Sequence, residues 1–311
     1  MSTFEADPAP AVLELLEGAP VALGGPRGFA VTRTLPHRQR RMVGAWCFLD
    51  AYGPHDLAGT GGMRVGPHPH TGLQTVTWLV AGEVLHRDSL GTVQEIRPGQ
   101  LSIMTAGRGI SHAEQTPDGH SAVLQGVQLW VALPHAVRDM PPAFAHHDDL
   151  PVVTDGGLRA TVLIGDLAGA ASPAPAHTPL VGAEVTLASG TESALALRPE
   201  FEYAVLALDG APAVAGVTLK PGPLLYLGSG RSSVRLATGS ASRLLLLGGE
   251  PFEERIVMWW NFVGRSGEEI AEYAGAWAEG DRFDDVPGFD GYRLGAPALP
   301  PLPLKPRGRV R

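Results

Sequence analysis

Short stretches of alternating or continuously apolar residues run along the chain, and glycine and proline stand between them. The chain contains 40 glycines and 28 prolines. Short apolar stretches bounded by these residues predict β-strands, and many such strands predict a sandwich or a barrel. The first predicted set is Phe29–Thr34, Gln74–Val80, Val84–Arg87, Leu101–Met104, Ala122–Ala132 and Leu158–Ile164. The second set is Ala183–Ala188, Tyr203–Leu208, Leu224–Leu227, Ser233–Ala237 and Arg243–Leu247.

A helical pattern follows these strands. Ser266 is placed to cap the helix, and Glu268 and Glu269 favour its first turn because the helix dipole attracts negative charge there. One face carries the apolar set Ile270, Tyr273, Ala274 and Trp277. After the helix, the tail Ala296–Arg311 is proline-rich and basic, so we expect it to be extended or loosely ordered.

An internal repeat relates the two sets of strands. When Gly82 is aligned with Gly210, the segments around Pro98 and Pro221 also resemble each other. The aligned pairs before the glycines are His68 with Ala196, His70 with Arg198, and Gln74 with Glu202. This predicts two copies of one β unit, of which the second lacks the histidines. The Ala- and Pro-rich segment Ala168–Pro179 would be a linker or crossover between them.

Composition restricts the class of protein. The chain has 311 residues, of which 44% are apolar and 18% charged, so it can bury a core and is not an acidic disordered protein. Its formal charge of -8 argues against a globally basic nucleic-acid binder. Arg38, Arg40 and Arg41 form a local cluster, which we interpret as a solvated turn. A basic patch is the alternative interpretation.

Cysteine content and hydropathy add further limits. The single cysteine, Cys47, excludes an intramolecular disulfide and a thiolate metal cluster, and its apolar neighbours suggest a buried small residue. The segment Met1–Asp7 lacks the pattern of a signal peptide. The aliphatic run Leu244–Leu247 is far too short to cross a bilayer. We therefore expect a cytoplasmic protein that does not enter the membrane.

Two pairs of side chains carry the chemistry. His68 and His70 are separated by one residue, and so are His112 and Glu114. Strand side chains alternate between faces, so each pair points to one side. We expect two strand pairs that face each other inside a barrel and bring three imidazoles and one carboxylate to one point. That donor set suits iron, manganese, nickel, copper or zinc.

The preferred coordination number decides how such a site would be used. On a six-coordinate metal, four protein ligands leave two positions for a substrate oxygen and O₂. On a metal that prefers four ligands, the same set would be closed and structural, as in a zinc site. His86 is either a neighbour that supports the ligands or an ordinary strand histidine. The remaining histidines of interest are interpreted as loop residues: His120, His135, His146, His147 and His177.

At this point the sequence resembles the pirin family. The similar segments are Gly66–Thr77, His86–Gly91, Arg97–Gly99, Met104–Glu114, Gly249–Pro251 and Trp260–Val263. The resemblance implies an all-β bicupin, with two β-barrel domains of the double-stranded β-helix (jelly-roll) type and a short C-terminal helix. It implies an N-terminal metal-binding cupin at 1–165, a degenerate cupin at 166–250, and a segment at 251–311 that packs back on the N-terminal domain.

The resemblance also implies Fe(II) bound by His68, His70, His112 and Glu114. The four positions coincide with those selected by spacing. Gln74 departs from the pattern, because pirins commonly carry glutamate there, and glutamine can donate a hydrogen bond where a carboxylate only accepts. The long proline-rich tail is a second departure.

Two functions follow from the resemblance. Some pirins are similar to quercetin 2,3-dioxygenases, which implies a small aromatic flavonol and O₂ as substrates, with Glu114 as the catalytic base. Other pirins resemble iron-dependent regulators that bind a transcription factor or a metabolic enzyme. We prefer the oxidoreductase, because an open metal position in a cupin favours chemistry, and we expect a monomer without a nucleic-acid partner.

Overall fold

Two compact units make up the protein. The computed structural model describes residues 12–23 and 29–310. Met1–Asp7, on which the expectation about a signal peptide rests, and Arg311 lie outside the described residues. What we call the N-terminal unit contains the described residues of 19–42, 46–149 and 253–310. The C-terminal unit contains 12–18, 43–45 and 150–252.

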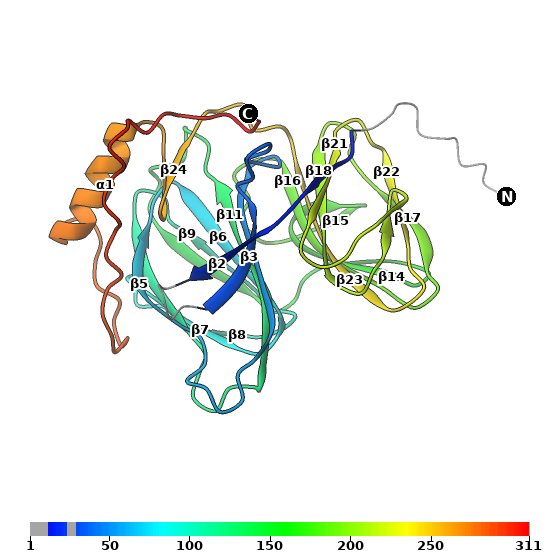
Figure 1. Cartoon of the computed structure of the whole chain (residues 1–311), viewed down its shortest axis with the longest axis horizontal. Helices are drawn as coiled ribbons and strands as arrows, with labels where there is room; N and C mark the ends of the chain where they lie inside the picture. The colour runs from blue at the N-terminus through cyan, green and yellow to red at the C-terminus, as the bar shows by residue number, and fades with distance from the viewer. Residues whose placement is uncertain (1–11, 24–28, 311) are drawn as a thin grey trace. The chain divides into compact units, whose positions relative to one another are not determined.

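The N-terminal unit is built from a larger and a smaller antiparallel sheet (Figure 1). The larger sheet has the order β12-β9-β6-β11-β4-β3-β2 and the smaller one β5-β10-β7-β8, while β24 and β25 form a hairpin. The strands are β2 (Ala19–Leu23), β3 (Phe29–Leu35), β4 (Trp46–Asp56), β5 (Arg64–His70), β6 (Leu73–Ala81), β7 (Val84–Asp88), β8 (Val93–Ile96), β9 (Leu101–Thr105), β10 (Ile110–Gln115), β11 (Val123–Ala132), β12 (Ala143–His147), β24 (Val257–Trp259) and β25 (Phe262–Gly264).

The C-terminal unit repeats this plan. Its larger sheet has the order β1-β21-β18-β23-β16-β14-β13, with β15 beside β14, and its smaller sheet has the order β17-β22-β19-β20. The strands are β1 (Glu14–Leu16), β13 (Val152–Asp155), β14 (Leu158–Leu167), β15 (Ala170–Ala171), β16 (Leu180–Leu187), β17 (Glu192–Ala196), β18 (Glu202–Asp209), β19 (Ala213–Val214), β20 (Val217–Thr218), β21 (Leu224–Gly228), β22 (Ser233–Ala237) and β23 (Ser242–Gly249).

Apolar side chains of both sheets meet in the core of each unit. In the C-terminal unit, Leu195 and Leu236 of the smaller sheet cluster with Val205 and Leu246 of the larger sheet. In the N-terminal unit, Val65 of β5 belongs to a buried apolar cluster that includes side chains of the larger sheet. Burial of one face from each sheet is what holds a two-layer β fold together.

The strand orders confirm the internal repeat. The series β9-β6-β11-β4 in one larger sheet corresponds to β21-β18-β23-β16 in the other, and β5-β10-β7-β8 corresponds to β17-β22-β19-β20. β6 and β18 are the strands that precede the aligned residues Gly82 and Gly210. The prediction of an all-β protein with two cupin domains and a short C-terminal helix is therefore confirmed.

The boundaries of the two compact units differ from the domain limits that the sequence predicts. The predicted limit at 165/166 falls inside β14, a strand that pairs with β13 and β16 of the C-terminal unit. β1 pairs with β21 of the same unit, although it lies near the start of the chain. The limits 1–165, 166–250 and 251–311 stay a prediction. The described residues of 19–42, 46–149 and those after 252 cluster in the N-terminal unit as that division expects, whereas 12–18, 43–45 and 150–165 cluster in the C-terminal unit.

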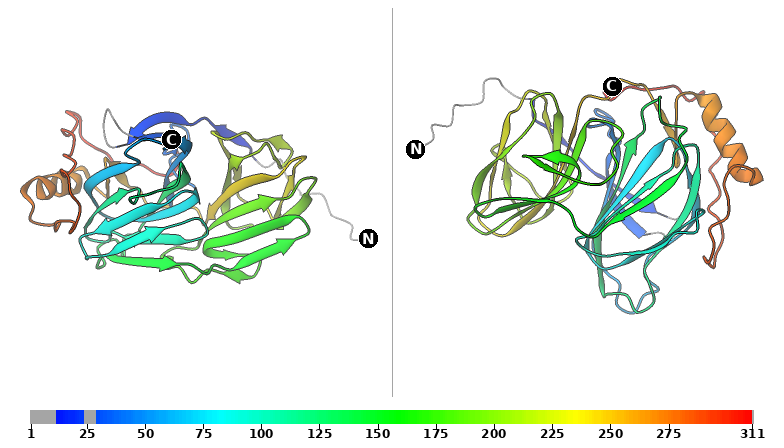
Figure 2. Two further views of the ribbon diagram at one scale, coloured as in Figure 1. Left: turned by 90° about the horizontal axis from the view of Figure 1, so that it is seen from below. Right: turned by 180° about the vertical axis from the view of Figure 1, so that it is seen from behind.

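The C-terminal segment carries the predicted helix α1 (Gly267–Glu279) along the N-terminal unit (Figures 1 and 2). Ser266 is the N-cap, and its hydroxyl oxygen accepts a hydrogen bond from the Glu269 amide at 3.3 Å. The helix ends at Gly280, whose left-handed backbone (φ 79°) suits glycine. Ile270, Tyr273 and Trp277 are buried, as the sequence pattern predicts, and Ala274 packs against them in part.

Two further expectations concern burial and membranes. Cys47 is fully buried in β4, and burial raises the pKa of its thiol to about 12, so it is the inert apolar residue that was expected. Within the described residues, the structure contains no helix of the length and apolar character needed to cross a bilayer.

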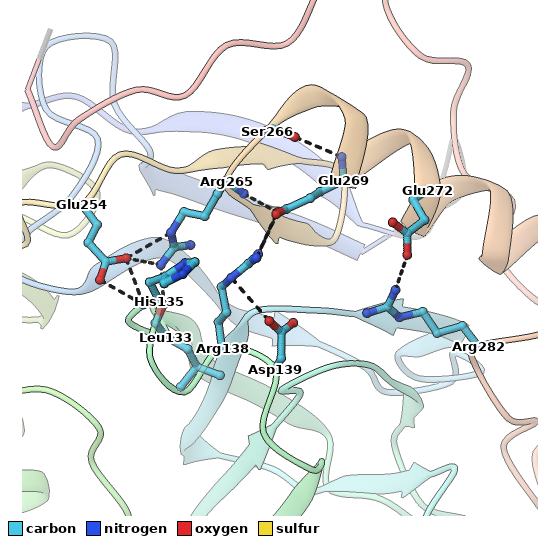
Figure 3. A network of polar contacts seen from close by, with 10 residues as sticks. All are labelled: Leu133, His135, Arg138, Asp139, Glu254, Arg265, Ser266, Glu269, Glu272 and Arg282. Atoms are coloured by element: carbon cyan, nitrogen blue, oxygen red, sulfur yellow. Dashed lines mark hydrogen bonds and ion pairs between the residues drawn. The ribbon is translucent and has the colours of Figure 1, made fainter.

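A network of charged side chains fixes α1 to the N-terminal unit (Figure 3). Arg138 donates two hydrogen bonds to the Glu269 carboxylate, at 2.7 and 2.8 Å. The same carboxylate accepts from the backbone amide of Arg265 at 2.7 Å. The Arg138 side chain is only 12% exposed, so removal of Glu269 would leave a largely buried cation without this partner.

We therefore predict that Glu269→Ala lowers the free energy of unfolding by roughly 2 kcal/mol, because hydrogen bonds to buried charges are lost. Glu272 lies on the same helix and pairs with Arg282, but its side chain is 68% exposed. Glu272→Ala should cost less than about 1 kcal/mol, since exposed ion pairs contribute little. Urea denaturation of both variants checks this, and equal losses would contradict it.

Candidate metal centre

Strand β10 lies between β5 and β7, and this pairing assembles the site. His112 on β10 is directly opposite His68 on β5 and opposite Asp88 on β7. Further along β10, Glu114 is opposite His86 of β7. Side chains that are directly opposite in an antiparallel pair lie on the same face and close together. One face of the smaller sheet thus carries all the candidate ligands.

This arrangement corrects one part of the sequence-based prediction. The two pairs do not come from strands that face each other across a barrel; β5 and β10 are hydrogen-bonded neighbours in one sheet. The register shifts between His112 and Glu114, because Glu114 lies opposite Val65. β5 therefore advances three residues while β10 advances two. Such a bulge re-aims side chains locally, and here it lies beside the ligand cluster.

Backbone carbonyl groups orient two of the imidazoles. The Nδ1 atom of His68 is 2.9 Å from the carbonyl oxygen of Gly66, and Nδ1 of His70 is 3.0 Å from that of Asn261. A carbonyl oxygen only accepts, so both Nδ1 atoms carry the proton. In a neutral imidazole the Nε2 atom then has a free lone pair. Both rings are thereby prepared to bind a cation through Nε2.

A chain of side chains orients the third imidazole. The carboxylate of Asp88 accepts from Nε2 of His86 at 3.1 Å, which leaves Nδ1 of His86 as an acceptor. That atom lies 3.4 Å from Nδ1 of His112. His112 therefore donates through Nδ1, and its Nε2 atom also has a free lone pair. Asp88 is itself fixed, because its other oxygen accepts from the amides of Leu90 and Thr92.

The three Nε2 lone pairs converge at a distance that fits a metal ion. Nε2 of His70 and Nε2 of His112 are 3.1 Å apart. Two ligands at right angles around an ion, each about 2.1 Å from it, would be about 3 Å apart. One ligand atom from each of His68, His70 and His112 lies within 4.8 Å of the others. Two lone pairs at this separation repel unless a cation or a proton lies between them, so the donor set fits a metal.

Glu114 belongs to an overlapping group. Its carboxylate and ring nitrogens of His86 and His112 lie within 4.8 Å of one another. Burial raises the pKa of Glu114, lowers that of His68 to about 4, and holds the pKa values of His70 and His112 well below the usual range. Neutral imidazoles are the form that binds metals.

The cluster opens into a cavity of about 540 Å³ in the N-terminal unit. Phe48 and Trp130 form part of its wall as a stacked pair, with ring centroids 3.9 Å apart and planes 11° from parallel. The Arg33 guanidinium lies 4.4 Å above the Phe48 ring and forms two 2.7 Å hydrogen bonds with Asp50. One end of the cavity thus carries metal ligands, and its wall is aromatic with a fixed cation.

Comparison with known proteins agrees with the fold. Residues 28–131 match the pirin family model, and residues 182–284 match that of the pirin C-terminal cupin domain. A Pseudomonas aeruginosa protein named "putative quercetin 2,3-dioxygenase" is 48% identical over 93% of this chain and 91% of its own. The chain belongs to the pirin family. A "pirin-like protein" of Caulobacter vibrioides is 37% identical over 81% of this chain and 89% of its own.

A solved structure is also similar over most of its length. The crystal structure of quercetin 2,3-dioxygenase from Acinetobacter baumannii superimposes with a TM-score of 0.91 at 43% identity, and the match covers 94% of this chain and 97% of that one. Similarity at this level extends to both cupin units and to the C-terminal segment.

The remaining sequence predictions in this pirin can now be placed. His86 is buried and supports His112, so it is not an ordinary strand histidine. Gln74 is fully buried, donates to the Thr105 hydroxyl at 3.0 Å, and is not among the residues that line the cavity. At the equivalent position of the repeat, the Glu202 carboxylate accepts from the Tyr226 hydroxyl at 2.7 Å.

The other histidines lie outside the cluster. His146 and His147 were interpreted as loop residues, but they lie on β12, where Nδ1 of His146 is 2.9 Å from the Ser102 hydroxyl. His120, His135 and His177 lie outside the strands. Within the described part of the chain, none of these joins a group that could hold a metal.

Asp88 and Asn261 orient histidines of the site, but the sequence did not identify either of them as a site residue. Asp88 lies two residues after His86 on one strand, so the same spacing rule that selected the ligands could have found it. Asn261 contributes through its backbone carbonyl and is 191 residues from His70 along the chain. Its segment Trp260–Val263 resembles pirins, but nothing in that resemblance indicates a contact with His70.

We predict that His70→Ala abolishes metal binding, because it removes one of the three converging nitrogens. His177→Ala should leave binding intact, since His177 lies in the C-terminal unit. Metal analysis of both purified variants after dialysis checks this. Retention of a full equivalent of metal by His70→Ala would show that the ligand set is wrong.

A second prediction concerns the residues behind the ligands. Asp88→Asn should weaken metal binding roughly 10- to 100-fold, because the asparagine no longer holds His86 and, through it, His112 as firmly. Asp118→Asn is the matched control, since Asp118 is exposed and outside the cluster. Chelator competition measures both affinities. Unchanged affinity in Asp88→Asn would mean that the Asp88-His86-His112 chain does not orient the ligand.

Proposed function

We propose that this pirin is an O₂-dependent dioxygenase that cleaves flavonols of the quercetin type and uses iron. The observation that carries the proposal is the cavity of about 540 Å³ at the histidine cluster. Sites for drug-sized ligands are typically of this size, apolar, and provided with a few convergent polar groups. The names of the similar Pseudomonas and Acinetobacter proteins support the same reaction.

His68, His70, His112 and Glu114 would hold the metal. Three imidazoles and a carboxylate suit Fe(II), and also Mn, Ni, Cu or Zn. When bound, the metal supplies Lewis acidity, which lowers the pKa of a phenolic hydroxyl group. Four protein ligands would leave positions open on a six-coordinate ion, whereas a structural zinc site would be closed. The adjoining cavity favours the open arrangement.

The cavity wall would bind the aromatic part of the substrate. Trp130 lies edge-on to the His70 ring, with centroids 5.1 Å apart, so its indole is beside the cluster. Trp130 is itself held by its stack on Phe48. A flat polyphenol gains dispersion and apolar burial against such a surface. Arg33, fixed by Asp50, would attract the negative charge that the substrate acquires on deprotonation.

Glu114 would act as the base. Its carboxylate reaches the cluster, so it can accept the proton from the 3-hydroxyl group of a flavonol bound there. In the metal-free protein, burial raises the pKa of Glu114. We retain the sequence-based expectation of a cytoplasmic monomer whose substrates are this flavonol and O₂.

The test is flavonol turnover by iron-loaded protein. In air, quercetin should lose its long-wavelength absorption at a rate proportional to enzyme, and under anaerobic conditions it should not. Trp130→Ala should raise KM by roughly tenfold, because it removes the aromatic wall and not the ligands. His70→Ala is the metal-free control.

Two outcomes would contradict the proposal. The first is an iron-loaded protein that leaves quercetin intact in air, which would favour the alternative of an iron-dependent regulator of a protein partner. The second is loss of absorption at the same rate in His70→Ala, which would mean that the reaction does not use this site.

A further inference from the structure

A second cavity lies in the N-terminal unit, apart from the histidine cluster. Its volume is about 630 Å³. Cys47 lines it, whereas the next residue of β4, Phe48, lines the metal cavity. Neighbouring side chains of a strand point to opposite faces. The two cavities are therefore on opposite faces of β4 and share none of their lining residues.

Three segments form the walls of this second cavity. They are the loop at 36–42, the start of β24 and the proline-rich tail at 300–308. The tail is held in place by backbone hydrogen bonds: Arg307 and Ile256 exchange two of them, at 2.8 and 3.0 Å, and the Arg41 amide donates to Arg309 at 2.7 Å. The tail, expected to be extended or loosely ordered, thus forms a defined wall.

The cavity is strongly positive. Arg38, Arg41, Lys305 and Arg307 line it, and no aspartate or glutamate is among the described residues that do so. Arg41 also donates to the carbonyl oxygen of Val310 at 3.0 Å, so it ties the tail as well. The whole chain has a formal charge of -8, so positive side chains are concentrated here although the chain is negative overall. Of the arginine cluster interpreted from sequence as a solvated turn, Arg38 and Arg41 line this cavity, whereas Arg40 is buried and does not.

The floor of the cavity is apolar. It includes the buried side chains of Met42, Cys47 and Val257. Leu302 of the tail also lines the cavity, yet 77% of it is exposed. An exposed leucine over an apolar floor is suited to cover the hydrocarbon part of a ligand, which would remove it from water.

We propose that this second cavity binds a small organic anion, with an apolar body on the Met42 floor and a carboxylate or phosphate group among Arg38, Lys305 and Arg307. Guanidinium and ammonium groups are the usual partners of both anions. The volume suits one small molecule. The buried apolar floor favours such a ligand over an acidic peptide, because the charged side chains of an acidic peptide gain nothing from contact with an apolar surface. The proposal does not depend on the reaction at the metal.

Titration calorimetry of the metal-loaded protein tests it with five probes: octanoate, octyl phosphate, octanol, inorganic phosphate and a hexaglutamate peptide. Octanoate or octyl phosphate should bind, and the one that binds more tightly identifies the head group. Octanol lacks the charge and inorganic phosphate lacks the apolar body, so each should bind at least tenfold more weakly.

The chain offers a matched control. It contains two lysines, Lys305 in the cavity wall and Lys220 in the C-terminal unit, and both are exposed. Lys305→Ala and Arg38→Ala should each weaken binding roughly tenfold, as expected for a lost charge-assisted hydrogen bond. Lys220→Ala should have no effect. The metal-free variant His70→Ala should bind octanoate as the parent protein does.

Four results would overturn the proposal. One is equal binding of octanol and octanoate, which would mean that the cations do not contribute. The second is equal affinity of Lys305→Ala and Lys220→Ala for octanoate, and the third is loss of octanoate binding in His70→Ala; either would place the anion elsewhere. The fourth is tighter binding of a hexaglutamate peptide than of octanoate and octyl phosphate, which would make the surface a protein-docking site.

Discussion

The pairing of β10 with β5 on one side and β7 on the other is the constraint on which the site depends. This register places His112 beside His68 and Asp88 at once. A slip by one residue would turn His112 toward the opposite face, because strand side chains alternate. Apolar burial in the unit opposes such a slip, since it would also turn the buried side chain of Ile110, which shares a face of β10 with His112. The core therefore fixes the positions of the ligands.

The position of the proton on each of the three imidazoles also prepares the site for a cation. Each of the three imidazoles uses Nδ1 to donate a hydrogen bond, two to backbone carbonyls and one to His86. All three Nε2 lone pairs are left to converge, and burial keeps the rings neutral. Such preparation lowers the cost of binding a cation, because neither a proton nor a ring orientation must change. The second unit keeps the same strands with Ala196 and Arg198 in the aligned positions, so the fold persists where these donors are absent.

The two cavities illustrate how one strand can serve two surfaces. Along β4, Phe48 and Asp50 line the metal cavity, while Cys47 lines the cationic one. The metal cavity combines neutral donors with aromatic rings, and the second cavity combines fixed cations with an apolar floor. The C-terminal segment contributes to both, through Asn261 at the first and the tail at the second. Its return to the N-terminal unit is thus part of each site.

Local patterns in the sequence were enough to predict many of the strands and the helix with its Ser266 cap, and to select the four candidate ligands. These depend on spacing over a few residues, and spacing over a few residues is what the periods of strands and helices record. The repeat came from comparing two distant parts of the chain. The sequence could not reveal that the ligands lie on adjacent strands, that β1 completes the other unit, or that Asn261 holds His70. It also could not show that the arginine cluster and the tail meet around a cavity. Each of these depends on which distant segments pair, and pairing is decided by burial of the whole core.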